Sequence, residues 1–307
     1  AFLAIMFLPR FLTMGIDPAH AVWDAVFMAI SVFNNAGFVI LPGGLEPHVT
    51  DWWMLVPIIL GTTVGAIGFP VIMDVAKNLR APRRWRLHTK LTLSTYLILA
   101  FIGALALALT EWHNPATLGS VDTPSKILNA MLAGVNSRSS GLSALNVGAM
   151  HSQTHFVQDI LMMIGGGSAS TAGGVKVTTF AVLVLAVIAE ARGDRDIETF
   201  GRRIPTSTVR LAVAVSLLGL AMVAISVVLL LTMTDHSLDI ILFETVSAFA
   251  TVGLSTGVTP NLPVAAKYVL IALMFAGRTG SMTVAAALAL RERSRVIRMP
   301  EEQPIIG

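Results

Sequence analysis

Apolar runs and short polar segments alternate along most of the chain. Leu91–Thr110 and Leu211–Leu231 contain no charged residue, and each is as long as the ~20 apolar residues that cross a bilayer. Trp52–Val75, Phe156–Glu190 and Leu262–Leu290 are further runs long enough to span, and we expect a kink at Pro70 in the first of them. This pattern predicts an all-α polytopic membrane protein, because helices satisfy their own backbone hydrogen bonds in lipid.

Three further apolar segments are too short to cross a bilayer, and each is followed by a polar loop that contains glycine. The short segments are Pro18–Phe33, Pro124–Val135 and Leu238–Ala250, and the loop glycines are Gly37, Gly141 and Gly253. An outward helix, a short re-entrant helix, a glycine loop and an inward helix therefore follow one another three times. The loop glycines are 104 and 112 residues apart, which indicates an internal repeat.

The repeat divides the chain into three predicted pore units at residues 1–90, 91–208 and 209–307. Residues 1–13 are apolar but too short to span, so we interpret them as the outer end of a truncated helix. A fourth unit upstream of residue 1 would close a central ion pore with pseudo-four-fold symmetry.

The basic residues orient the predicted helices. The chain is 54% hydrophobic and 13% charged, with a mean hydropathy of +0.75. Fifteen of its 21 Lys and Arg residues fall in three clusters: Lys77, Arg80, Arg83, Arg84, Arg86 and Lys90; Arg192, Arg195, Arg202, Arg203 and Arg210; and Arg291, Arg293, Arg295 and Arg298. By the positive-inside rule these loops and the C-terminus are cytoplasmic.

The same composition limits the possible partners. Binding of anionic membrane lipids is a second role that is compatible with the basic clusters. Nucleic-acid binding is not indicated, because the basic residues lie in linkers between hydrophobic segments. The chain has no cysteine, which excludes disulfides and thiolate metal sites.

The glycine loops are candidates for an ion filter. A re-entrant helix points its C-terminal end, with about half a negative elementary charge, at the pore axis. Carbonyls of the following loop can replace the hydration shell of a monovalent cation, and the loops contain no acidic residue that would suit a divalent one. The candidate filter residues are Asn35, Ala36, Gly37, Ser139, Ser140, Gly141, Thr251, Val252 and Gly253. A plain turn is the alternative for any one loop, but three matched loops favour a filter.

The inward segment Phe156–Glu190 contains a run of small residues that we expect to be unwound. These residues are Gly165, Gly166, Gly167, Ser168, Ala169, Ser170, Thr171, Ala172, Gly173 and Gly174. Unwound backbone at this depth needs a cavity or protein around it, which predicts a flexible plug below the filter. A small-residue helix contact is the alternative, and the spacing of a nucleotide P-loop is absent.

Charged residues near these segments have expected roles. Lys176 and Arg278 are intramembrane cations that we expect to act in gating, although Arg278 could instead hold a structural ion pair or a carbonyl. Glu244 is a candidate stabiliser of the Gly253 loop, on the side away from the pore. Arg138 is expected to brace the backbone of the Gly141 loop rather than face the ion.

Five segments resemble signatures of the Trk/Ktr/HKT potassium transporters, and the Ktr-type bacterial subunits look most similar. The filter-like segments are FNNAGF (Phe33–Phe38), SRSSGLS (Ser137–Ser143) and ATVGLSTG (Ala250–Gly257), and the others are GGGSASTAGGVK (Gly165–Lys176) and MFAGRTG (Met274–Gly280). The resemblance implies four pore units, of which this chain holds the second to fourth. It also implies K⁺ binding at the filter glycines and an intramembrane gating loop.

The resemblance further implies a homodimer in the bacterial inner membrane and a cytoplasmic regulatory ring that binds nucleotides. It implies no enzymatic activity and no organic cofactor. A Na⁺-permeable or an H⁺- or Na⁺-coupled transporter of the same family is the main alternative. An intramembrane serine hydrolase, with Ser168 or Ser170 as nucleophile and His155 as base, is a remote one. A transporter for an organic solute is a third.

Overall fold

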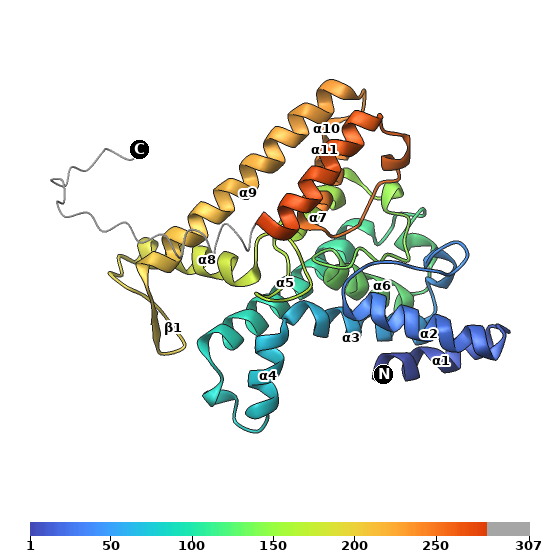
Figure 1. Ribbon diagram of the computed structural model, residues 1–307, viewed down its shortest axis with the longest axis horizontal. Coiled ribbons are helices and arrows are strands. Elements are labelled where there is room, and N and C mark those ends of the chain that lie inside the picture. The colour runs from blue at the N-terminus through green and yellow to red at the C-terminus, as the bar shows by residue number, and fades with distance from the viewer. Residues whose placement is uncertain (281–307) are drawn as a thin grey trace.

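Helices form almost all of the regular structure in the computed structural model, which describes residues 1–280 (Figure 1). The α-helices are α1 Phe2–Thr13, α2 Pro18–Phe33, α3 Trp52–Ile67, α4 Phe69–Lys77, α5 Leu87–Glu111, α6 Thr123–Asn136, α7 Ser152–Met163, α8 Val177–Arg192, α9 Thr206–Met233, α10 Leu238–Ala250 and α11 Val264–Phe275. Short 3₁₀ turns occur at Glu46–His48, Pro82–Arg84, Leu118–Ser120, Val147–Ala149 and Thr259–Asn261, and a π-helical turn at Ala276–Gly280 follows α11. The predicted all-α class is confirmed. The basic cluster Arg291, Arg293, Arg295 and Arg298 and the predicted C-terminal end lie outside the described residues.

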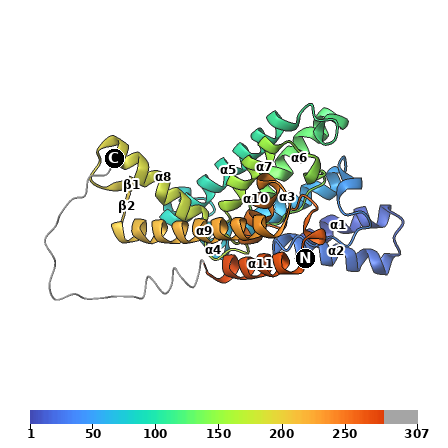
Figure 2. The same ribbon diagram turned by 90° about the horizontal axis from the view of Figure 1, so that it is seen from above.

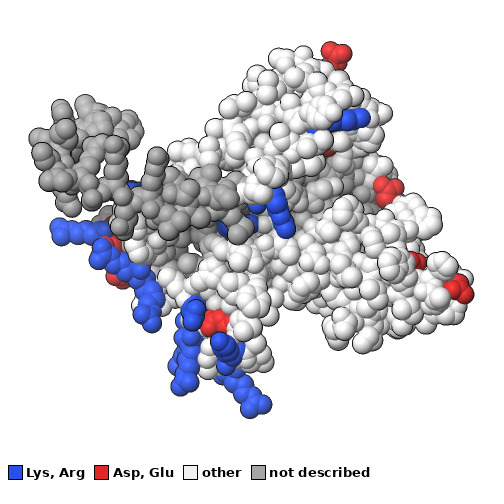
Figure 3. Space-filling model, in the orientation of Figure 1, with Lys and Arg blue, Asp and Glu red and all other residues white. Residues whose placement is uncertain are grey.

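A small β-hairpin was not predicted. Strands β1 (Ile197–Thr199) and β2 (Arg202–Ile204) pair antiparallel in the basic linker between α8 and α9. Phe200 and Gly201 connect them with φ angles of 51° and 71°, as a tight hairpin turn requires. Figure 3 shows Lys and Arg side chains gathered on the visible face at the end of the molecule that holds α4 and this hairpin.

Two helices in the described part of the chain are long and apolar enough to cross a membrane alone, namely α5 and α9. Helices α3 and α4 make a third span only as a bent pair, because they meet at 94°. The expected kink at Pro70 is wrong, since the break lies at Gly68. Gly68 has a φ of 96°, which favours glycine, whereas Pro70 fits the first turn of α4.

The predicted span Phe156–Glu190 is broken. Helix α7 ends at Met163 and α8 begins at Val177. The loop between them is closed at its base by a parallel bridge between Ile164 and Val175. We name Gly165–Gly174 the intramembrane loop. Its backbone is non-helical, as the run of small residues predicts.

The helices pack around two main apolar cores. One core joins α1, α2 and α3, and the other joins α7, α9, α10 and α11. Helix α6 contributes to both, through Leu128 and Leu132 to the first and Ala130 to the second. Figures 1 and 2 place α1 and α2 at one end of the molecule and the β-hairpin at the other.

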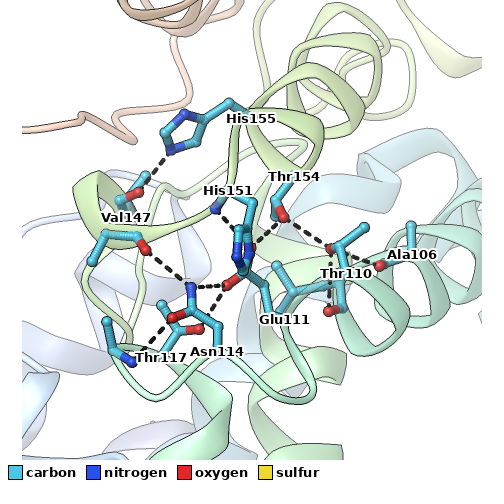
Figure 4. Close-up of polar contacts among 12 residues, drawn as sticks. Ala106, Thr110, Glu111, Asn114, Thr117, Val147, His151, Thr154 and His155 are labelled. Carbon is cyan, nitrogen blue, oxygen red and sulfur yellow. Dashed lines mark hydrogen bonds and ion pairs between the residues drawn. The ribbon is translucent and has the colours of Figure 1, made fainter.

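A buried carboxylate ties the end of α5 to the start of α7 (Figure 4). Glu111 is fully buried. Its Oε2 accepts hydrogen bonds from Asn114 Nδ2 at 2.6 Å and Thr117 Oγ1 at 2.7 Å. Its Oε1 accepts from the backbone N–H of His151 at 2.9 Å and from the Thr154 hydroxyl. Because four donors converge on one charge, this group fixes the connection between α5 and α7.

We predict that Glu111→Gln destabilises the protein by about 2 to 4 kcal/mol, because charge-assisted hydrogen bonds are lost and a donor is placed among donors. Thermal unfolding of the purified protein should show a melting temperature lowered by about 5 °C or more. Glu190→Gln is the matched control, because Glu190 is exposed on α8. Equal melting temperatures for the two variants would contradict this role.

Candidate ion-conducting site

The structure brings the three glycine loops into direct backbone contact. A Cβ atom on Gly37 would overlap the carbonyl oxygen of Ser140. A Cβ on Gly141 would likewise overlap the carbonyl oxygen of Val252. The Gly37 loop and the Gly141 loop therefore meet at Gly37, and the Gly141 loop and the Gly253 loop meet at Gly141.

Left-handed backbone recurs in these loops. Gly37, Gly141 and Gly253 have φ angles of 74°, 63° and 97°. Two non-glycine residues share this conformation, since Asn35 has φ 52° and Thr251 has φ 51°. Each of these two residues lies two positions before its loop glycine, just after the end of α2 or α10. The backbone thus leaves the helical path at the C-terminal end of each short helix, where the helix dipole is negative.

A polar side chain near the end of each short helix holds the loop that follows it. The acceptor in every case is the carbonyl oxygen of the residue directly after the loop glycine. The bonds are Ser31 Oγ to Phe38 O at 2.8 Å, Asn136 Nδ2 to Leu142 O at 2.7 Å, and Ser247 Oγ to Leu254 O at 2.6 Å. We name Ser31, Asn136 and Ser247 the loop clamps.

The sequence analysis did not identify these clamps. The signal available in the sequence is a Ser or Asn five or six residues before each loop glycine. On its own, such a residue near a helix end is unremarkable, because Ser and Asn often bond to nearby backbone. Only the three repeated bonds distinguish these residues from ordinary helix-end residues.

Glu244 also holds the Gly253 loop, as expected. Glu244 is buried on α10. Its Oε1 accepts hydrogen bonds from Ser255 Oγ at 2.8 Å and from Thr256 N and Oγ1 at 2.7 and 2.8 Å. Its Oε2 accepts from Thr259 Oγ1 at 2.5 Å. The carboxylate is therefore occupied by the loop's own donors.

The intramembrane loop packs against two of the three glycine loops. Asn35 Nδ2 donates a hydrogen bond to Thr171 Oγ1 at 2.6 Å, and Thr171 Oγ1 donates to the Gly65 carbonyl at 3.3 Å. A Cβ on Gly173 would overlap Thr251 Oγ1 and lie 2.6 Å from a neighbouring carbonyl oxygen. Glycine is therefore needed at residue 173 to allow this contact with the Gly253 loop.

Both intramembrane cations bind carbonyls of this loop. Arg278 Nη1 donates a hydrogen bond to the carbonyl of Thr171. Lys176 Nζ donates to the carbonyl of Ala172 at 2.5 Å. Within residues 1–280, neither cation forms an ion pair with a carboxylate. The structural partner of Arg278 is therefore a backbone carbonyl and not an ion-pair partner within residues 1–280.

The expectation that Arg138 braces the backbone of the Gly141 loop is wrong. It is fully buried, and its guanidinium lies 3.8 Å from the centre of the Tyr96 ring. In the described part of the chain, none of its side-chain nitrogens has a hydrogen-bond acceptor. The stacking on Tyr96, rather than hydrogen bonding, holds the side chain in place.

The serine hydrolase arrangement does not form. His155 Nε2 is hydrogen-bonded to the Val147 carbonyl at 2.8 Å (Figure 4). Ser168 Oγ is instead 3.0 Å from Thr178 Oγ1, and Ser170 Oγ accepts from a backbone N–H. The described residues also contain no group of three His, Cys, Asp or Glu side chains that could hold a metal ion. These loops therefore present backbone carbonyls and hydroxyls rather than a catalytic pair.

Comparison with known proteins finds similar sequences. The family model described as TrkH, cation transport protein, matches residues 2–297. The chain is 40% identical to Ktr system potassium uptake protein B of Bacillus subtilis, over 94% of this chain and 64% of that protein. It is 32% identical to potassium/sodium uptake protein NtpJ of Enterococcus hirae, over 99% of this chain and 67% of that protein.

A solved structure has the same fold. The crystal structure of the potassium transporter TrkH from Vibrio parahaemolyticus matches with a TM-score of 0.70 and 18% identity, over 94% of this chain and 62% of that chain. The chain spans 64% of the length of the Bacillus relative. These matches extend over nearly the whole sequence, and the chain belongs to the TrkH family of cation transport proteins, which are membrane transporters.

Proposed function

We propose that this chain is part of a potassium uptake transporter, in which K⁺ passes the filter residues of three glycine loops. The observation that carries the proposal is the direct backbone contact of the loops at Gly37 and Gly141. Matched loops that meet at their glycines can direct several carbonyl oxygens at one dehydrated cation. The name of the Bacillus relative, a potassium uptake protein, supports K⁺ as the cargo.

The proposed chemistry is coordination without a cofactor. Residues 35–37, 139–141 and 251–253 would supply carbonyl and hydroxyl oxygens, and the short helices would add the negative ends of their dipoles. In this proposal, residues 1–90, 91–208 and 209–307 form three pore units of a four-unit pore. The loop clamps would fix the carbonyl positions, because each holds the residue directly after a filter glycine.

The intramembrane loop is the proposed gate. It contacts Asn35 of the Gly37 loop and Thr251 of the Gly253 loop, so it lies directly against the proposed filter. Arg278 and Lys176 bind its carbonyls, and their charges would oppose the passage of cations. Displacement of residues 165–174 would open the path and remove the anchor of both cations.

Sodium transport is the second candidate. The name of the Enterococcus relative, potassium/sodium uptake protein, favours it. One left-handed glycine per loop gives a short array of carbonyls, which would discriminate less between the two ions than a longer array. H⁺ or Na⁺ coupling belongs to the same alternative.

We also propose an orientation and partners. The basic linkers around α4 and the β-hairpin would face the cytoplasm of a bacterial inner membrane. This face could dock a regulatory ring that binds nucleotides, and the transporter would work as a homodimer. The gathering of Lys and Arg at one end of the molecule supports the orientation (Figure 3).

We predict that Gly141→Ala lowers K⁺ uptake about tenfold or more, because the new methyl group meets the Val252 carbonyl at a strained φ. Uptake of ⁸⁶Rb⁺ by proteoliposomes that contain the full-length protein measures this. Gly193→Ala is the control, since Gly193 has a φ of 74° but nothing within 4 Å of its Cβ position. Equal uptake by the two variants would contradict the filter assignment.

For the clamps, we predict that Ser247→Ala lowers the preference for ⁸⁶Rb⁺ over ²²Na⁺ about fivefold, as expected for a lost hydrogen bond of ~1 kcal/mol. Ser247→Thr should retain the preference, because the hydroxyl remains. Ser216→Ala is the matched control, since the Ser216 hydroxyl has no hydrogen-bond partner in the described part of the chain. An unchanged preference in Ser247→Ala would exclude the positioning role.

For the gate, we predict that Arg278→Gln raises ⁸⁶Rb⁺ flux about tenfold, the effect of losing a charge-assisted hydrogen bond to the intramembrane loop. Lys267→Gln is the matched control. Lys267 lies in α11, which directly precedes the π-helical turn that holds Arg278, and it also donates to a backbone carbonyl, that of Pro260, at 2.7 Å. A flux that falls or stays constant in Arg278→Gln would refute the gating role of this bond.

A further inference from the structure

A cavity of about 500 Å³ lies beside the intramembrane loop, between the N-terminal ends of α5, α8 and α9. Its walls are mainly apolar and include Leu91, Val182, Leu211 and Ala212. Its volume falls in the range of about 300 to 1,000 Å³ that is usual for small-ligand pockets. Nothing in the proposed path of the ion accounts for an apolar cavity at this position.

The polar part of the cavity is cationic. Lys176 and His88 are the titratable groups among its described lining residues, which include no Asp or Glu. Lys176 has three donor hydrogens, and within the described residues its ammonium donates a hydrogen bond to the Ala172 carbonyl. A cation inside a membrane protein is stabilised by a paired anion. The cavity therefore combines an apolar volume with an ammonium group that lacks a counter-ion within residues 1–280.

The same cavity reaches the tip of the intramembrane loop. Ser168 and Ala169 line it, and Ala169 has a φ of 55°. This conformation is costly for a residue with a Cβ, so the loop is strained where it faces the cavity. Ser168 is also 3.0 Å from Thr178 of α8, which likewise lines the cavity.

We infer that this cavity binds one long-chain fatty acid, with its carboxylate on Lys176 and its chain between α5, α8 and α9, and that binding opens the gate. This inference rests on the proposed function for its effect on flux, but not for the binding itself. Charge complementarity selects an anion, and the apolar walls select a hydrocarbon chain. The volume lies within the range of a pocket for one small ligand, which favours a lipid with a single chain.

Binding would act on the gate in two ways. The carboxylate would neutralise the Lys176 charge, which lowers the electrostatic barrier to a cation that passes the loop. It would also compete with the Ala172 carbonyl for the ammonium, because a charged acceptor makes the stronger hydrogen bond. Both effects favour displacement of the loop, so the fatty acid should increase K⁺ flux.

The test uses the full-length protein in nanodiscs, with oleate as the probe and oleyl alcohol as the uncharged analogue. Oleate should bind at one saturable site, and oleyl alcohol about tenfold more weakly, as should oleate to Lys176→Gln. Ala212→Trp should fill the cavity and weaken oleate binding about tenfold or more. Val213→Trp is the matched control, because Val213 is exposed on the next position of α9.

Flux into proteoliposomes that contain the same full-length proteins then tests the regulatory part. Oleate should raise ⁸⁶Rb⁺ flux in the wild type and in Val213→Trp, but not in Ala212→Trp. Equal oleate binding by Ala212→Trp and Val213→Trp would overturn the site, as would a phospholipid retained there in native mass spectrometry. Oleate binding without a change in flux would overturn the regulation. A wild type that binds oleate but conducts no cation would instead contradict the proposed function.

Discussion

Close contact between backbone segments at glycine is the constraint on which the rest of this structure depends. Backbone that leaves a helix inside a membrane must be surrounded by protein or line a water-filled cavity. Here the loops surround one another, because Gly37 lies against Ser140 and Gly141 against Val252. A side chain at either glycine would separate the loops, so their geometry is a property of all three units together.

The same device connects the loops to the surrounding helices. Gly65 of α3 packs on the Phe33 carbonyl, and Gly277 packs on the Phe249 carbonyl. In these two repeats, the segment that follows the glycine loop thus approaches the end of the short helix. Gly173 brings the intramembrane loop against Thr251 in the same way. Such close contact would couple the proposed gate directly to the proposed filter.

The sequence predicts the class of fold, the short helices and the unwound loop, because hydrophobic length and glycine content are local properties. Helix α10 even begins and ends where expected, at Leu238 and Ala250. The break at Gly68 was misplaced to Pro70, because proline fits the first turn of a new helix and only the contact of Gly68 with the intramembrane loop fixes the bend. The stacking of Arg138 on Tyr96, from another helix, likewise depends on long-range packing that no local pattern encodes.

The central claim is that the packed glycine loops discriminate among monovalent cations. The most direct measurement is the uptake of ⁸⁶Rb⁺ and ²²Na⁺, side by side, into liposomes that contain the unmodified full-length protein. Carbonyl coordination at the three loops predicts faster uptake of ⁸⁶Rb⁺ than of ²²Na⁺. Equal uptake of the two ions would contradict a potassium filter at these loops.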